Sequence, residues 1–169
     1  MSCQWYGPCF GQYLSSYYCD NRPSSTSTSG IRNENLEALT FDTAVFDLVI
    51  TQDVFEHIEH PVRAFSEVGR VLKPGGSHVF TIPFYPEQLT ETRVRIEHGQ
   101  PVSEHELEYH GNPVDDNGSL VFTRFGFDLK DIIFNASGMT TTIHPMHEPR
   151  LGIEGESVIV FHSVKSSDN

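Results

Sequence analysis

Cysteine is scarce in this chain of 169 residues, with only Cys3, Cys9 and Cys19, all within the first 20 positions. The number is odd and no CxxC pair occurs, which argues against a disulfide framework and predicts a reducing, cytoplasmic location. The spacing of the three cysteines also differs from that of a structural zinc site.

Basic residues and long apolar runs are also lacking. Lysine and arginine total 11 against 23 aspartates and glutamates, which gives a net charge of −12. Such a chain is repelled by phosphate backbones and by anionic lipid, so we expect no nucleic-acid partner and no membrane partner. No stretch approaches the ~20 apolar residues of a membrane span. The first residues lack the basic start and the apolar core of a secretory signal.

The composition that remains predicts one globular domain, since 37% of the residues are hydrophobic and 20% are charged. Residues 1–30 form an aromatic N-terminal segment that ends in a flexible loop rich in serine and threonine. Residues 31–165 show the regular patterning of an α/β domain. Within it, residues 85–118 are acidic and broken by proline and glycine, which indicates an insertion or lid.

Hydrophobic periodicity predicts strands and helices in alternation. A nearly continuous β-branched run is typical of a strand buried on both faces, whereas apolar residues at three- and four-residue spacing predict a helix. The turn Lys73–Gly76 should end the first helix, because proline cannot continue it and glycine permits the turn. The last two strands are close in sequence, so we expect an antiparallel pair at one edge of the sheet. The expected strands are Phe46–Thr51, Ser77–Pro83, Met139–His144 and Glu156–His162, and the helices are Pro61–Leu72 (with Val62, Phe65, Val68 and Leu72 inward) and Asp128–Gly138.

The stretch FDLVITQDVFEHIEHPVRAFSEVGRVLKPGGSHVFTIP, from Phe46 to Pro83, resembles the second half of a class I S-adenosylmethionine-dependent methyltransferase. The later stretch LEYHGNPVDDNGSLVFTRFGFDL resembles a subgroup of methyltransferase-domain proteins. The resemblance implies a Rossmann-like methyltransferase sheet with helices on both faces and an antiparallel last strand. It also implies S-adenosylmethionine as cofactor and methyl transfer to a small-molecule or glycan-type acceptor.

The front of the chain departs from that family. In the family a glycine-rich turn after the first strand cradles the methionine part of the cofactor. Here Gly7 and Gly11 lie among cysteines and aromatics, and no GxGxG occurs before Ile31. We therefore expect a methyltransferase truncated at its N-terminus, without its first strand and helix, and weak or absent S-adenosylmethionine binding by this chain alone. Two alternatives stay open: an inactive remnant that acts as a binding or interaction module, and a module for some other small ligand.

The resemblance suggests five cofactor-binding residues. Glu34, Asn35 and Leu36 follow the expected third strand, where the family binds adenine; the alternative is a solvated loop. Gln52 and Asp53 lie just past the strand that begins at Phe46, where open α/β sheets bind ligands. The alternative for Asp53 is a helix N-cap.

Two histidines are the candidate catalytic residues. His57 could act as a general base or orient a substrate, and the alternative is a structural histidine bonded to a loop carbonyl. The resemblance places His110 near the active cleft, as a substrate contact. His98, His105 and His110 accompany glutamates in the insertion, but their spacing favours a solvated lid over a metal site. We therefore predict no metal ligands.

Loss of the first strand would leave the strand Phe46–Thr51 with an unpaired edge, which stable proteins cover or pair. We expect the aromatic N-terminus to cover it, through Trp5, Phe10, Tyr13 and Tyr17. A homodimer or another partner chain would serve equally. A small-molecule acceptor is the other expected partner.

Overall fold

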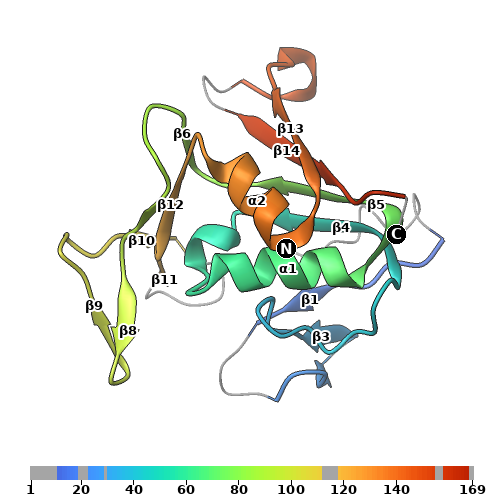
Figure 1. The fold of residues 1–169 in the computed structure, drawn as a ribbon, viewed down its shortest axis with the longest axis horizontal. Coiled ribbons are helices and arrows are strands. Elements are labelled where there is room, and N and C mark those ends of the chain that lie inside the picture. Colours follow the sequence, from blue (N-terminus) through green and yellow to red (C-terminus); the bar gives the residue numbers. More distant parts are fainter. Residues whose placement is uncertain (1–10, 19–22, 29, 112–117, 155–157, 168–169) are drawn as a thin grey trace.

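A four-stranded sheet forms the centre of the protein in a computed structural model, which describes residues 11–18, 23–28, 30–111, 118–154 and 158–167. The strand order is β13-β14-β5-β4 (Figure 1). β4 and β5 are parallel, whereas β14 is antiparallel to both of its neighbours. This confirms the α/β class and the antiparallel pair at the edge. The bounds are β4 Phe46–Gln52, β5 Leu72–Thr81, β13 Thr140–Pro145 and β14 Ile159–Val164.

β4 differs from its prediction as a strand buried on both faces. Its residues are half-buried or exposed, and Ile50 is 44% exposed. The physical reason is its position: among the described strands only β5 pairs with β4, and no described helix covers its outer face. β5 alternates between buried and half-buried residues over Ser77–Thr81, as a strand covered mainly on one face does.

The predicted turn Lys73–Gly76 lies inside β5, as an irregular stretch where the register against β4 shifts between Phe46 and Leu48. Gly76 is required there. A Cβ on Gly76 would lie 2.9 Å from the carbonyl oxygen of Lys73 and 3.2 Å from that of Asp47.

Helices α1 (Pro61–Val71) and α2 (Leu129–Ser137) lie side by side on one face of the sheet (Figure 1). Pro61 begins α1, and Gly138 in the left-handed conformation ends α2, as expected. The helices touch at Gly69, where a Cβ would lie 2.8 Å from that of Ser137. The second helical layer implied by the resemblance is not supplied by a described helix.

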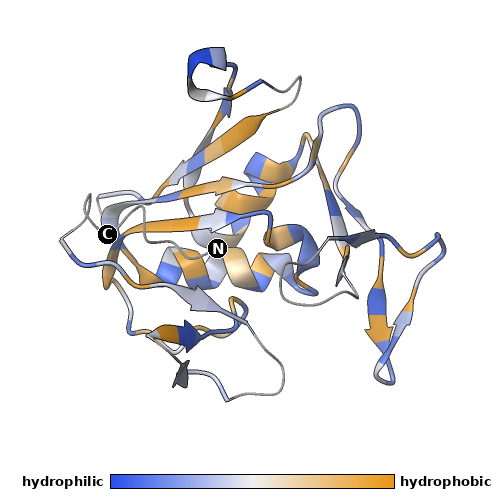
Figure 2. Cartoon of the chain, turned by 180° about the vertical axis from the view of Figure 1, so that it is seen from behind, coloured by the Kyte–Doolittle hydropathy of each residue, from blue (hydrophilic) through white to orange (hydrophobic). Residues whose placement is uncertain are grey.

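Phenylalanines dominate the core between these helices and the sheet. Figure 2 shows hydrophobic segments of the helices and the sheet in orange. Phe55 and Phe65 stack with ring centroids 4.1 Å apart. One expected core residue is wrong: Val62 is 54% exposed, because the inner face of α1 is formed by Ala64, Phe65 and Val68 instead. The fully buried side chains of the cluster include Phe55, Ala64, Phe65, Val68, Leu72, Phe125, Leu129, Ile133, Met139 and Phe161.

Several short strands surround this central unit. β1 (Ser16–Tyr17), β2 (Ser27–Thr28) and β3 (Ile31–Asn33) form a small sheet in the order β1-β3-β2. β6 (Phe84–Tyr85) and β7 (Glu91–Thr92) flank β12 (Thr123–Gly126), and β10 (Tyr109–His110) pairs with β11 (Ser119–Leu120). β8 (Arg95–Glu97) and β9 (Gln100–Val102) form a hairpin that projects from the insertion, and the 3₁₀ turns are η2 (Phe55–His57) and η3 (Pro149–Leu151) (Figure 1).

The predicted cover of the β4 edge depends largely on residues that are not described. Trp5 and Phe10 lie outside the described residues, and Tyr17 belongs to β1, which pairs with β3. The packing of the N-terminus against β4 therefore stays a prediction. Within the described residues, no helix is long and apolar enough to span a membrane.

Candidate active site

The carboxyl ends of the parallel strands β4 and β5 meet at one edge of the sheet, and Gln52 and Asp53 lie there. The amide of Asp53 donates to the carbonyl of Thr81, 3.0 Å away, and the Thr81 hydroxyl donates to the Asp53 carboxylate over 3.0 Å. Asp53 has a φ of +49°, a conformation that aspartate tolerates better than most residues. Asp53 is not the N-cap of the turn that follows. Val54 holds the N-cap position of η2, and no side chain caps this turn. Both Gln52 and Asp53 are exposed at the edge where α/β sheets bind ligands.

The turn η2 points three consecutive side chains in different directions. Phe55 enters the core, where it stacks on Phe65. Glu56 is only 1% exposed, and neither of its carboxylate oxygens has a hydrogen-bond partner. The backbone carbonyl of Glu56 accepts a hydrogen bond from the amide of Phe122, 2.8 Å away, which fixes the turn against the β11–β12 segment. Burial, which has the larger effect, and the nearby charge of Asp53 together raise the pKa of Glu56 to about 7.

His57 and His110 face the Glu56 carboxylate from two elements far apart in sequence. The Nε2 atom of His57 lies 3.6 Å from Glu56 Oε1, and the Nδ1 atom of His110 lies 3.8 Å from the same oxygen. The two imidazole rings meet edge to face, with centroids 5.0 Å apart. Burial lowers the pKa of His57, and His110 lowers it further, against the opposing effect of the bond to Leu120.

Each imidazole also has an outer partner. His57 Nδ1 lies 2.9 Å from the carbonyl oxygen of Leu120, so Nδ1 carries the proton and Nε2 faces the cluster. His110 Nε2 lies 3.4 Å from Oε1 of Glu108. Arg124 donates to the other Glu108 oxygen over 2.7 Å, and this bond lowers the pKa of Glu108. The structure thus brings the two predicted catalytic histidines together, and the loop-carbonyl bond expected of a structural histidine is present at His57 as well.

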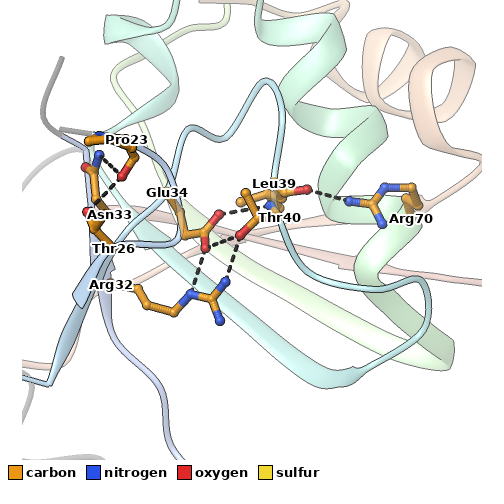
Figure 3. Close-up of polar contacts among 8 residues, drawn as sticks. All are labelled: Pro23, Thr26, Arg32, Asn33, Glu34, Leu39, Thr40 and Arg70. Carbon is orange, nitrogen blue, oxygen red and sulfur yellow. Dashed lines mark hydrogen bonds and ion pairs between the residues drawn. The ribbon is translucent and has the colours of Figure 1, made fainter. Parts of the chain in front are cut away.

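The predicted adenine loop is held by its own side chains (Figure 3). Glu34 is 3% exposed and accepts hydrogen bonds from Arg32 Nε at 2.8 Å and from the Thr40 amide and hydroxyl at 2.9 and 2.6 Å. Asn35 Oδ1 accepts from the Glu37 amide over 2.8 Å. Leu36 is half-buried against the core. The carboxylate of Glu34 is therefore committed to the loop, while Leu36 and the amide nitrogen of Asn35 are left for a ligand.

Two cavities lie away from this edge. One of about 560 Å³ is lined by residues 88–92 and Arg95, and another of about 460 Å³ lies between the start of α1 and β12. Neither is lined by Gln52, Asp53 or the Glu56–His57–His110 cluster. The candidate site is therefore separate from both of these cavities.

The described residues fit only part of the family's cofactor. Asn35 and Leu36 lie on the loop after β3, and Gln52 and Asp53 lie at the carboxyl end of β4; these positions suit the adenosine end. The methionine end needs close approach by several backbone amides, which glycines permit. The described glycines before β4 are Gly11 and Gly30, and they form no GxGxG turn. The cradle for the methionine end is thus not supplied by the described residues.

Glu56 is the functional candidate that sequence reasoning missed. Its neighbour His57 was selected because histidine titrates near neutral pH. The burial of Glu56 depends on contacts across more than fifty residues of sequence, through Phe122 and His110. A local signal was available, since Glu56 lies within the short run Val54–Ile58, whose other members are apolar apart from His57.

The sequence comparisons agree with this architecture. Residues 10–80 match the methyltransferase-domain family. A sarcosine/dimethylglycine N-methyltransferase from Halorhodospira halochloris is 36% identical over 78 residues, which cover 46% of this chain and 26% of that protein. The chain thus spans about a quarter of the length of this curated relative.

Solved structures extend the match beyond the shared sequence. A Haloferax volcanii methyltransferase in complex with the Trm112 methyltransferase activator aligns with a TM-score of 0.53 and 16% identity, over 83% of this chain and 64% of that one. An S-adenosylmethionine-dependent methyltransferase from Mesorhizobium loti aligns with a TM-score of 0.50 and 17% identity, over 83% of this chain and 72% of that one. These likenesses establish the Rossmann-like methyltransferase fold. The sequence match to the methyltransferase-domain family covers residues 10–80 and agrees with this fold.

Proposed function

We propose that this chain carries the acceptor side of an S-adenosylmethionine-dependent methyltransferase that acts on a small polar molecule or a glycan-type acceptor. The observation that carries the proposal is the shared edge of β4 and β5. Gln52 and Asp53 emerge there, Glu56 and His57 follow within five residues of Asp53, and His110 joins them from β10. When bound, S-adenosylmethionine supplies the methyl group.

The cofactor side is assigned to the two loops beside this edge. Leu36 supports one face of the adenine, and the side-chain amide of Asn35 contacts its rim. Glu34 is a positioning residue, because its bonds to Arg32 and Thr40 hold the loop in shape. Gln52 and Asp53 bind the part of the cofactor nearest the acceptor.

The acceptor side is assigned to His57 and His110. Both side chains are partly open to solvent, with 19% and 33% exposure, so a polar acceptor can reach them. Their outer partners leave one ring nitrogen of each directed toward Glu56. The two histidines therefore orient the acceptor, and effective positioning is most of what methyl transfer requires of a protein.

The edge of β4 is the place for a partner. Val45 and Ile50 are 40% and 44% exposed, and no described strand pairs with the outer side of β4. The Haloferax volcanii methyltransferase of similar fold binds a protein activator. We propose that the N-terminal segment, a second copy of the chain or a partner protein covers this edge, in the reducing cytoplasmic setting that the cysteines predict.

The test is a chemical-shift map with S-adenosylmethionine at about 1 mM, where even weak binding is visible. The proposal predicts amide shifts at Asn35, Leu36, Gln52 and Asp53. Residues of the β8–β9 hairpin serve as the internal control and should not move. If no shifts occur at the first four amides, the proposal is wrong and the chain is an inactive remnant that serves as a binding module.

A further inference from the structure

Glu56 poses a problem that the methyltransferase role of the site does not resolve. A carboxylate that is 1% exposed, with both oxygens lacking a hydrogen-bond partner, is costly, and such groups call for an explanation. A buried carboxylate that keeps its charge is paired or bound to a metal ion, and one that has neither takes up a proton. Among the described residues, no arginine or lysine forms an ion pair with Glu56, and ring nitrogens of His57 and His110 lie 3.6 and 3.8 Å from its Oε1 atom.

The distances suit a common ion. Two ligand atoms of one ion with bonds of ~2.1 Å lie ~3–4 Å apart. The separations of Glu56 Oε1 from His57 Nε2 and from His110 Nδ1 are 3.6 and 3.8 Å. All three ligand atoms lie within 4.8 Å of one another, so the two imidazoles need to approach by about 1 Å on binding. Among the residues that the structure describes, Glu56, His57 and His110 form the group of three histidine, cysteine, aspartate or glutamate side chains whose ligand atoms lie close enough together to hold a metal ion.

The outer contacts of the two histidines are those of metal ligands. A metal-bound histidine commonly donates its second ring N–H to a carbonyl or a carboxylate, which fixes the ring. His57 has the Leu120 carbonyl as this partner, and His110 has Glu108. Arg124 in turn holds Glu108 in place. These contacts leave His57 Nε2 and His110 Nδ1 directed toward Glu56.

We propose that Glu56, His57 and His110 bind a divalent first-row transition-metal ion such as Zn²⁺, through one carboxylate and two imidazoles. Two nitrogen ligands favour ions of this series over Mg²⁺ and Ca²⁺, which prefer oxygen. Three protein ligands leave a position open for water or for an oxygen of the acceptor. The ion's role as an acceptor-binding centre rests on the proposed function, whereas its binding by the three side chains does not.

The experiment is a calorimetric titration of the full chain with Zn²⁺, together with NMR of the histidine ring nitrogens. The variants are Glu56→Gln and His110→Asn, and the matched control is His98→Asn in the exposed turn between β8 and β9. The proposal predicts one ion that shifts His57 Nε2 and His110 Nδ1. It also predicts that each site variant weakens binding by tenfold or more, while His98→Asn leaves it unchanged. If Glu56→Gln fails to fold, His110→Asn, at a partly exposed position, decides the question alone.

Two results overturn the proposal. One is the absence of binding up to about 1 mM Zn²⁺. The other is undiminished binding in His110→Asn, which would mean an adventitious ion only, held by other histidines or by the cysteines. The S-adenosylmethionine shift map is recorded without added metal. A positive map with no zinc binding therefore overturns this inference and leaves the proposed function standing.

Discussion

His78 is a buried histidine whose protonation should govern the acid stability of this fold. It lies in β5 with no exposed surface, and its ring stacks on Phe80 with centroids 4.5 Å apart. Its Nε2 atom lies 3.0 Å from the hydroxyl of Thr51 in β4, and its Nδ1 atom has no partner. Burial lowers the pKa of His78 to about 3, because the charged ring would lose its hydration.

The sign of the pH dependence follows from this shift. The unfolded chain takes up a proton at His78 below its ordinary pKa of about 6.5, whereas the folded chain remains neutral there until about pH 3. The free energy of unfolding contributed by His78 is therefore fully present above pH 6.5 and is lost as the pH falls toward 3. One pH unit corresponds to about 1.4 kcal/mol, so we expect a loss of about 2 kcal/mol between pH 7 and pH 5.

Urea unfolding at pH 7 and pH 5 tests this expectation. The variant His78→Phe fills the same space among Phe55, Phe65 and Phe80 but cannot titrate, and losing the bond to Thr51 should cost about 1 kcal/mol at both pH values. Relative to wild type, the variant should gain about 2 kcal/mol on going to pH 5. His98→Asn, at an exposed position, is the matched control and should follow wild type. Equal pH dependence of wild type and His78→Phe would refute the reasoning.

Two further substitutions probe the structure around the site. Glu34→Gln places an amide donor among the donors of Arg32 and Thr40, so it should lower the free energy of unfolding by about 2–3 kcal/mol in urea melts. The exposed control Glu87→Gln should change it by less than about 0.5 kcal/mol, and an equal effect of both would exclude a structural role for Glu34. Gly76→Ala should cost about 1–3 kcal/mol, because its Cβ would approach the backbone oxygens of Lys73 and Asp47 to 2.9 and 3.2 Å. A melting temperature equal to that of wild type would show that β5 relaxes around the new methyl group.

Local sequence patterns correctly predicted features that depend on only a few neighbouring residues, such as helix ends and the pairing of strands close in sequence. Pro61 and Gly138 set the helix ends correctly, and the closeness of the last two strands predicted the antiparallel pair of β13 and β14. The same reasoning failed for β4 and for Val62. Burial there depends on which elements lie opposite, and a β-branched run does not reveal whether its outer edge is paired.

The candidate site was predictable as a set of residues but not as an arrangement. His57 and His110 were both selected, yet they come together only through the contact between η2 and the β10–β11 pair. The short apolar run around Glu56 is a local signal of burial, but the sequence does not state that both carboxylate oxygens are shielded from water. In the same way, only the three-dimensional contacts show that Glu34 is committed to Arg32 and Thr40.

We propose that the described residues supply the acceptor side and the adenosine end of a methyltransferase site, but not the backbone cradle for the methionine end of the cofactor. Calorimetric titration of S-adenosylmethionine into the full chain tests this most directly. Each missing hydrogen bond to a charged group is worth about 1 kcal/mol or more, so the account predicts a Kd weaker than about 10 µM. One site per chain with a Kd well below about 10 µM would contradict it, because the cradle would then have to be present.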